Sequence, residues 1–333
     1  MSFRAVLHRR VAERVAAMPD ADAARWIEGH GLLAMAADPA LPEPVRGRLA
    51  DAARRTAAYN LRAVSRFEDA VAALAGIPVC PLKGIYLLDT VYRDEPGARV
   101  LGDVDLLVPA ARIDEAVARL EAGLGMTELP ASRRLRGLGP ERILAGRGFA
   151  LDLHDRLGFA YGWASTWDDL APTPARVHGL PVHALGREAT LVHLMTHLVK
   201  HRPLSRLSWV EDVLRWAAGG VDGGRAVEVA RRIGALRSLV AGTRVLRRLV
   251  GDGLLPGIPE TVPGPARGLL LANERHLWRD LRRRPLPDPI AVSGRRPGRF
   301  GALSGMLLAD RPSHALRIVR VRALQALAGR HVG

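Results

Sequence analysis

The sequence predicts an α+β fold in which a small mixed β-sheet lies between helical segments and the C-terminal half is helical. Apolar residues recur every three or four positions through residues 1–75, which indicates helices. From residue 77 the pattern changes to short apolar runs that end at glycine or acidic residues, as in strands. We therefore expect a helical lead-in over 1–75, a mixed-sheet core over 76–185 and a helical domain over 186–333.

The predicted sheet is built from short segments around one charged loop. A strand, a short helix, a second strand and a second helix follow one another at residues 77–83, 85–92, 103–109 and 110–125. Two further strand candidates lie around 126–136 and at 149–157, are joined by a region of Gly/Pro turns, and are expected to pair antiparallel. Helices are predicted in the C-terminal half at residues 187–201, 209–220 and 226–251.

The composition is that of a globular protein with an unusual set of basic residues. The chain has 333 residues, is 48% hydrophobic and carries a formal net charge of +15, with only two lysines, Lys83 and Lys200. No run of about 18 apolar residues and no signal peptide is visible, so we expect a cytoplasmic protein without a transmembrane segment. The single cysteine, Cys80, excludes an internal disulfide and a zinc site built from cysteines.

Arginines are concentrated in the basic C-terminal segment, residues 275–333. Such a segment can contact an acidic partner, for example RNA, nucleotide or a membrane surface. A solvated tail is the alternative, because few aromatic residues interleave with the arginines.

Two carboxylates flank one apolar residue of the second predicted strand. Asp103 and Asp105 are two residues apart and therefore project from the same face of a strand. Close carboxylates repel each other unless a cation lies between them, and oxygen ligands of this kind suit Mg²⁺ or Mn²⁺ ions that also bind phosphates. We expect that neutralising either one abolishes metal-dependent chemistry and leaves the fold intact or more stable. A solvated turn at Gly102-Asp103 is the alternative.

The residues before this pair favour a phosphate site. The first strand ends at Gly84, where the missing side chain would let a phosphate approach the start of the next helix. Lys83 is a candidate contact to that phosphate, in a chain that almost never uses lysine. Arg99, four residues before Asp103, is a candidate to neutralise the same polyanion.

The order PLKG, a short helix with tyrosine, a loop with arginine, GDVDLLV, a helix and LDLH resembles the uncharacterised bacterial nucleotidyltransferase family of the polymerase-β-like superfamily, over about residues 55–215. The resemblance implies a nucleotidyltransferase core that binds a nucleoside triphosphate and two divalent ions. Carried over, the metal-binding and catalytic acids are Asp103, Asp105 and Asp152, with Asp155 as the alternative for the third.

One residue departs from the superfamily pattern, in which a serine usually follows the glycine of the first motif. Here Ile85 follows Gly84, and Lys83 is the candidate to contact the phosphate instead. His154 shares a strand face with Asp152, so we expect it to orient that carboxylate or to contact substrate.

The resemblance implies an enzyme that moves a nucleoside monophosphate from the triphosphate to an unknown acceptor, which is a small molecule, a peptide or protein, or an RNA end. One alternative is a nucleotide-binding accessory protein without turnover. Another is an RNA-binding module that uses the basic C-terminal segment.

A second group of polar residues lies on the predicted C-terminal helices. Three histidines recur every four residues along one helix face: His193, His197 and His201. They lack the glutamate of the H-E-x-x-H zinc motif, so packing between helices is favoured over metal binding or contact with an acceptor. The next helix is expected to carry a core-facing stripe with one polar member: Trp209, Asp212 and Trp216.

Overall fold

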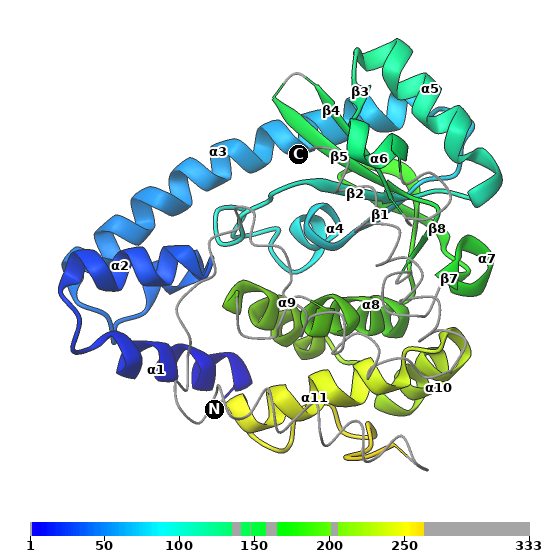
Figure 1. The fold of residues 1–333 in the computed structure, drawn as a ribbon. Coiled ribbons are helices and arrows are strands. Elements are labelled where there is room, and N and C mark those ends of the chain that lie inside the picture. Colours follow the sequence, from blue (N-terminus) through cyan, green and yellow to red (C-terminus); the bar gives the residue numbers. More distant parts are fainter. Residues whose placement is uncertain (1, 135–140, 147, 158–164, 201–205, 263–333) are drawn as a thin grey trace.

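The computed structural model describes residues 2–134, 141–146, 148–157, 165–200 and 206–262. Within this part of the chain, a five-stranded mixed sheet lies next to a long helix, and a layer of C-terminal helices lies below it (Figure 1). The fold class is therefore the α+β class that the sequence predicts. His201 and the basic C-terminal segment lie outside the described residues.

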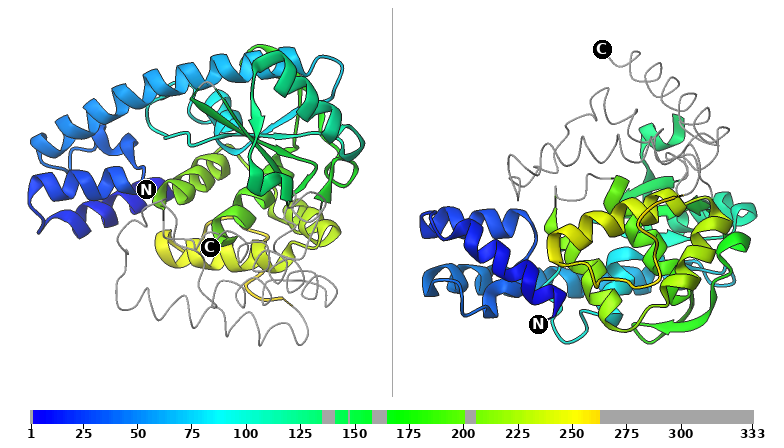
Figure 2. Two further views of the ribbon diagram at one scale, coloured as in Figure 1. Left: turned by 45° about the horizontal axis from the view of Figure 1, so that its top comes forward. Right: turned by 90° about the horizontal axis from the view of Figure 1, so that it is seen from below.

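The N-terminal part is helical, as its periodicity predicts. Its elements are α1 (Phe3–Val15), α2 (Asp20–Gly29), the 3₁₀ helix η1 (Leu33–Ala37) and α3 (Glu43–Ala73). Helix α3 packs on α2 and η1 and also on helices beside the sheet, so it connects the N-terminal helices to the core, as two further views show (Figure 2). Its buried face includes Val45, Leu49 and Phe67, which are fully buried.

The sheet has the order β1-β2-β5-β4-β3. Its strands are β1 (Cys80–Leu82), β2 (Val104–Leu107), β3 (Thr127–Glu128), β4 (Glu141–Gly146) and β5 (Phe149–His154). Strands β2 and β5 are parallel and all other pairs are antiparallel, which makes the sheet mixed. Helices α4 (Lys83–Thr90) and α5 (Ile113–Leu124) follow β1 and β2, and α5 packs on β3, β4 and β5.

The expected pairing of residues 126–136 with 149–157 is wrong. Strand β4 lies between β3 and β5, and the chain after β3 forms the short helix α6 (Pro130–Arg134). Alternation in β4 is hidden in the sequence because Arg142 occupies a buried position. Its guanidinium donates to Glu128 of β3 at 3.0 Å and to Asp114 of α5 at 2.8 Å, so charge pairing replaces an apolar contact there.

Two small hairpins connect the sheet to the helical half. The first pairs β6 (Arg156–Leu157) with β7 (Ser165–Thr166), the second pairs β8 (Thr173–Val177) with β9 (Leu180–Ala184), and α7 (Trp167–Leu170) lies between them. Strand β9 lies beside the residues that lead into β1, where the backbone N–H of His183 donates to the carbonyl of Val79 at 2.8 Å.

The described C-terminal helices are α8 (Arg187–Lys200), α9 (Leu207–Ala218), α10 (Gly223–Ile233) and α11 (Leu236–Val250). The periodic run at 226–251 is divided between two helices, because Gly234 adopts a left-handed conformation (φ 75°) that ends α10. Helix α1 packs on α9 and α11, so both ends of the described chain contribute to this layer (Figure 1). None of the described helices is long and apolar enough to cross a membrane.

Candidate active site

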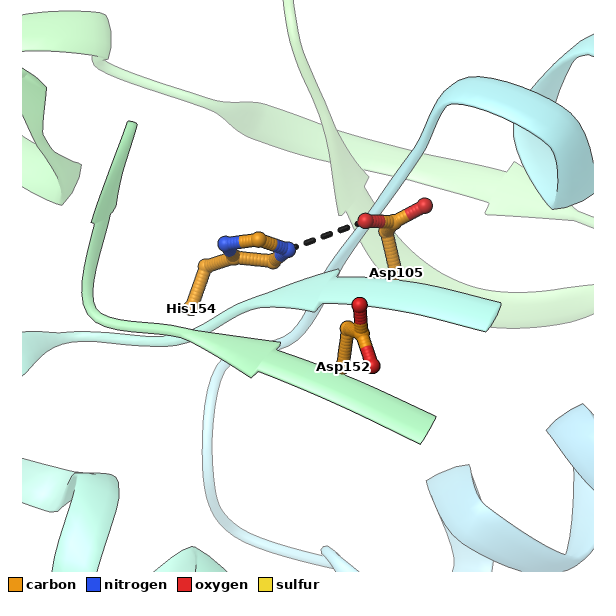
Figure 3. Close-up of side chains that lie close together, drawn as sticks. All are labelled: Asp105, Asp152 and His154. Atoms are coloured by element: carbon orange, nitrogen blue, oxygen red, sulfur yellow. Dashed lines mark hydrogen bonds and ion pairs between the residues drawn. The ribbon is translucent and has the colours of Figure 1, made fainter. Parts of the chain in front are cut away.

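Strands β2 and β5 bring two of the predicted carboxylates side by side. In their parallel register Asp105 is the direct partner of Asp152, while Leu106 and Leu153 are partners on the buried face. His154 follows on the same face of β5 as Asp152. Figure 3 shows the three side chains projecting from adjacent strands toward one another.

The Asp105 carboxylate is the centre of this group. Its Oδ1 accepts hydrogen bonds from Lys83 Nζ at 2.5 Å and from His154 Nε2 at 2.9 Å, and the residue is only 2% exposed. Burial alone would raise the pKa of Asp105, but Lys83 and His154 outweigh it and hold the pKa well below its usual range. Asp105 is therefore ionised and fixed by two donors before any ligand binds.

Lys83 reaches Asp105 from an unusual backbone conformation. It has φ of +45° at the junction of β1 and α4, a left-handed conformation that costs a non-glycine residue about 1–2 kcal/mol. Burial opposes its charge, but Asp105 and then Asp103 raise the pKa of Lys83 overall, so it stays an ammonium ion. The strained backbone at Lys83 thus places a positive charge beside the Asp105 carboxylate.

Gly84 is required by packing at this junction. A Cβ atom there would lie 2.3 Å from Leu101 Cδ2 and 2.4 Å from Arg99 Nη1. Real Cβ atoms do not approach other atoms so closely, so only glycine fits without movement of its neighbours. The phosphate contact expected at Gly84 stays a prediction, and the structure adds a packing reason for the residue.

The remaining two carboxylates hold protons more tightly than usual. Burial, followed by the charges of Asp105 and Asp103, raises the pKa of Asp152 to about 7. Asp103 is an exposed residue, yet nearby protein atoms partly dehydrate its carboxylate, and this effect and the Asp105 charge raise the pKa of Asp103 as well. The negative charges of Asp103, Asp105 and Asp152 are therefore not fully offset when no further cation is bound.

Asp105, Asp152 and His154 fit a divalent ion. Each offers one ligand atom, and these atoms all lie within 4.8 Å of one another. Three protein ligands leave positions for water or phosphate oxygens, as in sites that bind a metal together with a phosphorylated substrate. The imidazole favours a transition metal over Mg²⁺, and the two carboxylates are ligands that suit Mn²⁺ among these metals. Asp103, predicted as a metal ligand, lies outside this group of three, and its metal role stays a prediction.

Arg99 lies in a buried ion pair. Its guanidinium makes three hydrogen bonds to the Asp212 carboxylate of α9, at 2.9, 3.1 and 3.0 Å. Tyr92 also donates to Asp212 at 2.9 Å. Asp212, the polar member of the stripe predicted on α9, therefore anchors the loop before Asp103 to the helical half. Whether Arg99 also neutralises a polyanion stays a prediction.

Helix α3 holds the same loop from the other side. The Asn60 side chain donates to the carbonyl groups of Pro96 and Arg99, both at 2.7 Å, and accepts from the N–H of Leu101 at 3.4 Å. Gly97 packs so closely on α3 that a Cβ would lie 2.2 Å from the carbonyl oxygen of Ala53. Sequence reasoning missed both residues, and the only available signal was a lone asparagine on the apolar side of a long helix.

The other predicted candidates lie apart from this group. Asp155 is bonded to its neighbour Arg156 at 2.9 Å and is not one of the three possible metal ligands. On α8, the ring of His197 packs edge-on against Trp209 at 5.0 Å between centroids, in line with the expected packing role. His193 contributes its carbonyl to Thr196, whose hydroxyl donates to it at 2.7 Å.

Comparison with known proteins agrees with the resemblance seen in the motifs. Residues 22–251 match the profile of the family described as "Uncharacterised nucleotidyltransferase", a longer stretch than the motif-bearing region at 55–215. No curated protein matches the chain.

Among solved structures, the chain overlaps that of the antibiotic-resistance factor ANT(2'')-Ia at 18% identity and a TM-score of 0.40, with 57% of this chain and 98% of that one covered. An overlap this loose carries no functional information about the present chain.

The family match over residues 22–251 includes the two acidic strands β2 and β5, Lys83 and the anchoring helix α9. It shows that the chain belongs to the uncharacterised nucleotidyltransferase family.

Proposed function

We propose that the protein transfers a nucleoside monophosphate from a nucleoside triphosphate to an acceptor that carries a hydroxyl or phosphate group. The observation that supports this most strongly is the buried Asp105 carboxylate, held by Lys83 and His154 with Asp152 beside it, within the stretch that matches the family. A chain that needed only a stable sheet would gain little from two carboxylates side by side on one polar face.

Asp105, Asp152 and His154 would hold the divalent ion in this proposal. When bound, such an ion supplies positive charge at the phosphates and stabilises the charge that develops during transfer. Lys83 adds a second positive charge beside Asp105 and binds the phosphate chain.

The transfer itself exchanges one phosphorus–oxygen bond for another. The acceptor oxygen forms a bond to the α-phosphorus while the bond from that phosphorus to the oxygen that bridges to the β-phosphate breaks, and pyrophosphate leaves. Asp152, which lies beside Asp105 as the third carboxylate of the proposed site, takes the proton of the acceptor hydroxyl.

Label transfer from α-³²P-labelled nucleoside triphosphates tests this function. The full chain, with Mn²⁺ or Mg²⁺, is incubated with separate pools of small metabolites, proteins and RNA, and both labelled products and pyrophosphate are measured. We expect a labelled acceptor with the wild type and a loss of at least 100-fold with Asp105→Asn or Asp152→Asn.

Asp155→Asn is the matched control, because Asp155 lies next to the site in sequence but bonds to Arg156 instead. It should keep most of the activity. Nucleotide binding without any transfer or pyrophosphate release would contradict the enzyme and support an accessory protein.

A further inference from the structure

Lys83 and the possible metal ligands come from the two strands that flank β2 within the sheet. Strand β2 lies between β1 and β5. Lys83 follows directly after Leu82, the residue of β1 that pairs with Asp105. Asp152 and His154 lie on β5, on the other side of Asp105. Lys83 thus reaches the carboxylate from the β1 end and His154 from β5, and both contact the same oxygen, Oδ1.

Lys83 already occupies a place at the Asp105 carboxylate. Its Nζ contacts Oδ1 at 2.5 Å, and a second ion shared by Asp103 and Asp105 would compete with the ammonium group for this carboxylate. The charge of Lys83 also counteracts the rise in the pKa of Asp103, so the ammonium group acts on both carboxylates. A second ion therefore cannot share the position of the ammonium group, because two cations repel each other strongly at so short a separation.

Charge counting leads to the same result. Arg99 and Asp212 offset each other in their ion pair. Lys83 faces Asp105, and Arg206, at the start of α9, lies near enough to Asp103 for their charges to interact. The Arg206 Nε is buried and has no hydrogen-bond partner among the described residues. When Asp103, Asp105 and Asp152 are all ionised, three negative charges face the two positive charges of Lys83 and Arg206, and one divalent ion more than offsets the difference.

We propose that the Lys83 ammonium permanently takes the place of a second divalent ion, so that the chain binds one divalent ion, between Asp105, Asp152 and His154. This inference rests on the proposed function, since it describes how the same site would hold a nucleotide. It departs from the two ions that the family resemblance implies. Lys83 would then act on the phosphates as a built-in cation.

Counting bound Mn²⁺ tests the proposal. The full chain is dialysed to equilibrium against Mn²⁺ alone and against Mn²⁺ with β,γ-imido-ATP, and metal and nucleotide per chain are measured, with electron paramagnetic resonance to detect coupling between ions. We expect one uncoupled Mn²⁺ per chain in the wild type under both conditions. Two Mn²⁺ per chain, coupled or not, or no bound Mn²⁺ would overturn the proposal.

Two variants of Lys83 complete the test. Lys83→Met keeps the length and removes the charge, so it should bind two coupled Mn²⁺ with the nucleotide analogue, whereas Lys83→Arg should still bind one. A count of one for a folded Lys83→Met would also overturn the proposal, and if that variant does not fold, the wild-type and Lys83→Arg counts decide. Metal counts do not depend on turnover: one Mn²⁺ without nucleotidyl transfer contradicts the proposed function alone, and two with transfer contradict this inference alone.

Discussion

The buried pair of Arg99 and Asp212 gives the sharpest test of how the helical half supports the site. Their side chains are 11% and 3% exposed. Asp212→Asn keeps the shape and the acceptor for Tyr92 but leaves the guanidinium without a counterion. Removing one partner of a buried ion pair costs about 3–5 kcal/mol, a large part of the roughly 5–15 kcal/mol that stabilises a typical domain.

Urea denaturation followed by circular dichroism measures this loss in free energy of unfolding. The control is an exposed pair on α2, Arg25 and Asp22, at 3.1 Å with side chains 77% and 53% exposed. Arg25→Met should cost less than about 1 kcal/mol, because solvent already screens that pair. A loss for Asp212→Asn as small as the loss for this control would refute the reasoning.

A double variant separates the pair from its surroundings. Arg99→Met with Asp212→Asn removes both charges, so the double variant should be more stable than the sum of the single losses predicts, by about 2 kcal/mol or more. Additive losses would show that the two side chains stabilise the fold independently. Since Arg99 belongs to the loop before Asp103, the single variants should also weaken Mn²⁺ binding.

Three further predictions follow from the environments of single residues. Gly97→Ala should destabilise by about 1–3 kcal/mol, because its Cβ would lie 2.2 Å from a backbone oxygen of α3, whereas Gly47→Ala in that helix, with nothing within 4 Å, should stabilise by up to about 1 kcal/mol; melting temperatures that move together would contradict this. In the metal-free chain the folded state holds the Asp152 proton up to about pH 7, so this group's contribution to the free energy of unfolding should fall as pH rises from about 4 to about 7; denaturation at several pH values should show that fall in the wild type and lose it in Asp152→Asn. Contrary to the expectation from the sequence, Asp105→Asn should lower the melting temperature because it strips a buried lysine of its counterion, whereas Asp103→Asn should leave the melting temperature unchanged or raise it; equal shifts would count against the pairing of Lys83 with Asp105.

Features set by local periodicity were predictable from the sequence. Alternation in β5 places Asp152 and His154 on one face, and the structure has them so. The direct pairing of Asp152 with Asp105 was not predictable, because register between strands far apart in sequence depends on the strand order of the whole sheet. For the same reason His154 was expected to orient Asp152 or to contact substrate, and its hydrogen bond goes to Asp105.

Buried charges hid other features. Strand β4 escaped prediction because Arg142 stands where alternation calls for an apolar residue. Asp212, between two tryptophans on α9, indicates that a cation must be buried opposite it. Nothing local says which of the 47 arginines supplies that cation, and Arg99 is 113 residues away in the chain.

The use of lysine at position 83, in a chain with 47 arginines, follows from the shape of its partner. The Asp105 Oδ1 is shared with His154 Nε2, so the cation must contact a single oxygen from one direction. An ammonium ion is a compact point charge and satisfies this geometry, while a planar guanidinium prefers two acceptor oxygens at once. Lys83→Arg should therefore keep the positive charge, and with it the number of bound ions, but displace the carboxylate and lose nucleotidyl transfer. The rarity of lysine marked this position as a functional candidate, and the direct partner that the structure gives it is a carboxylate of the chain itself.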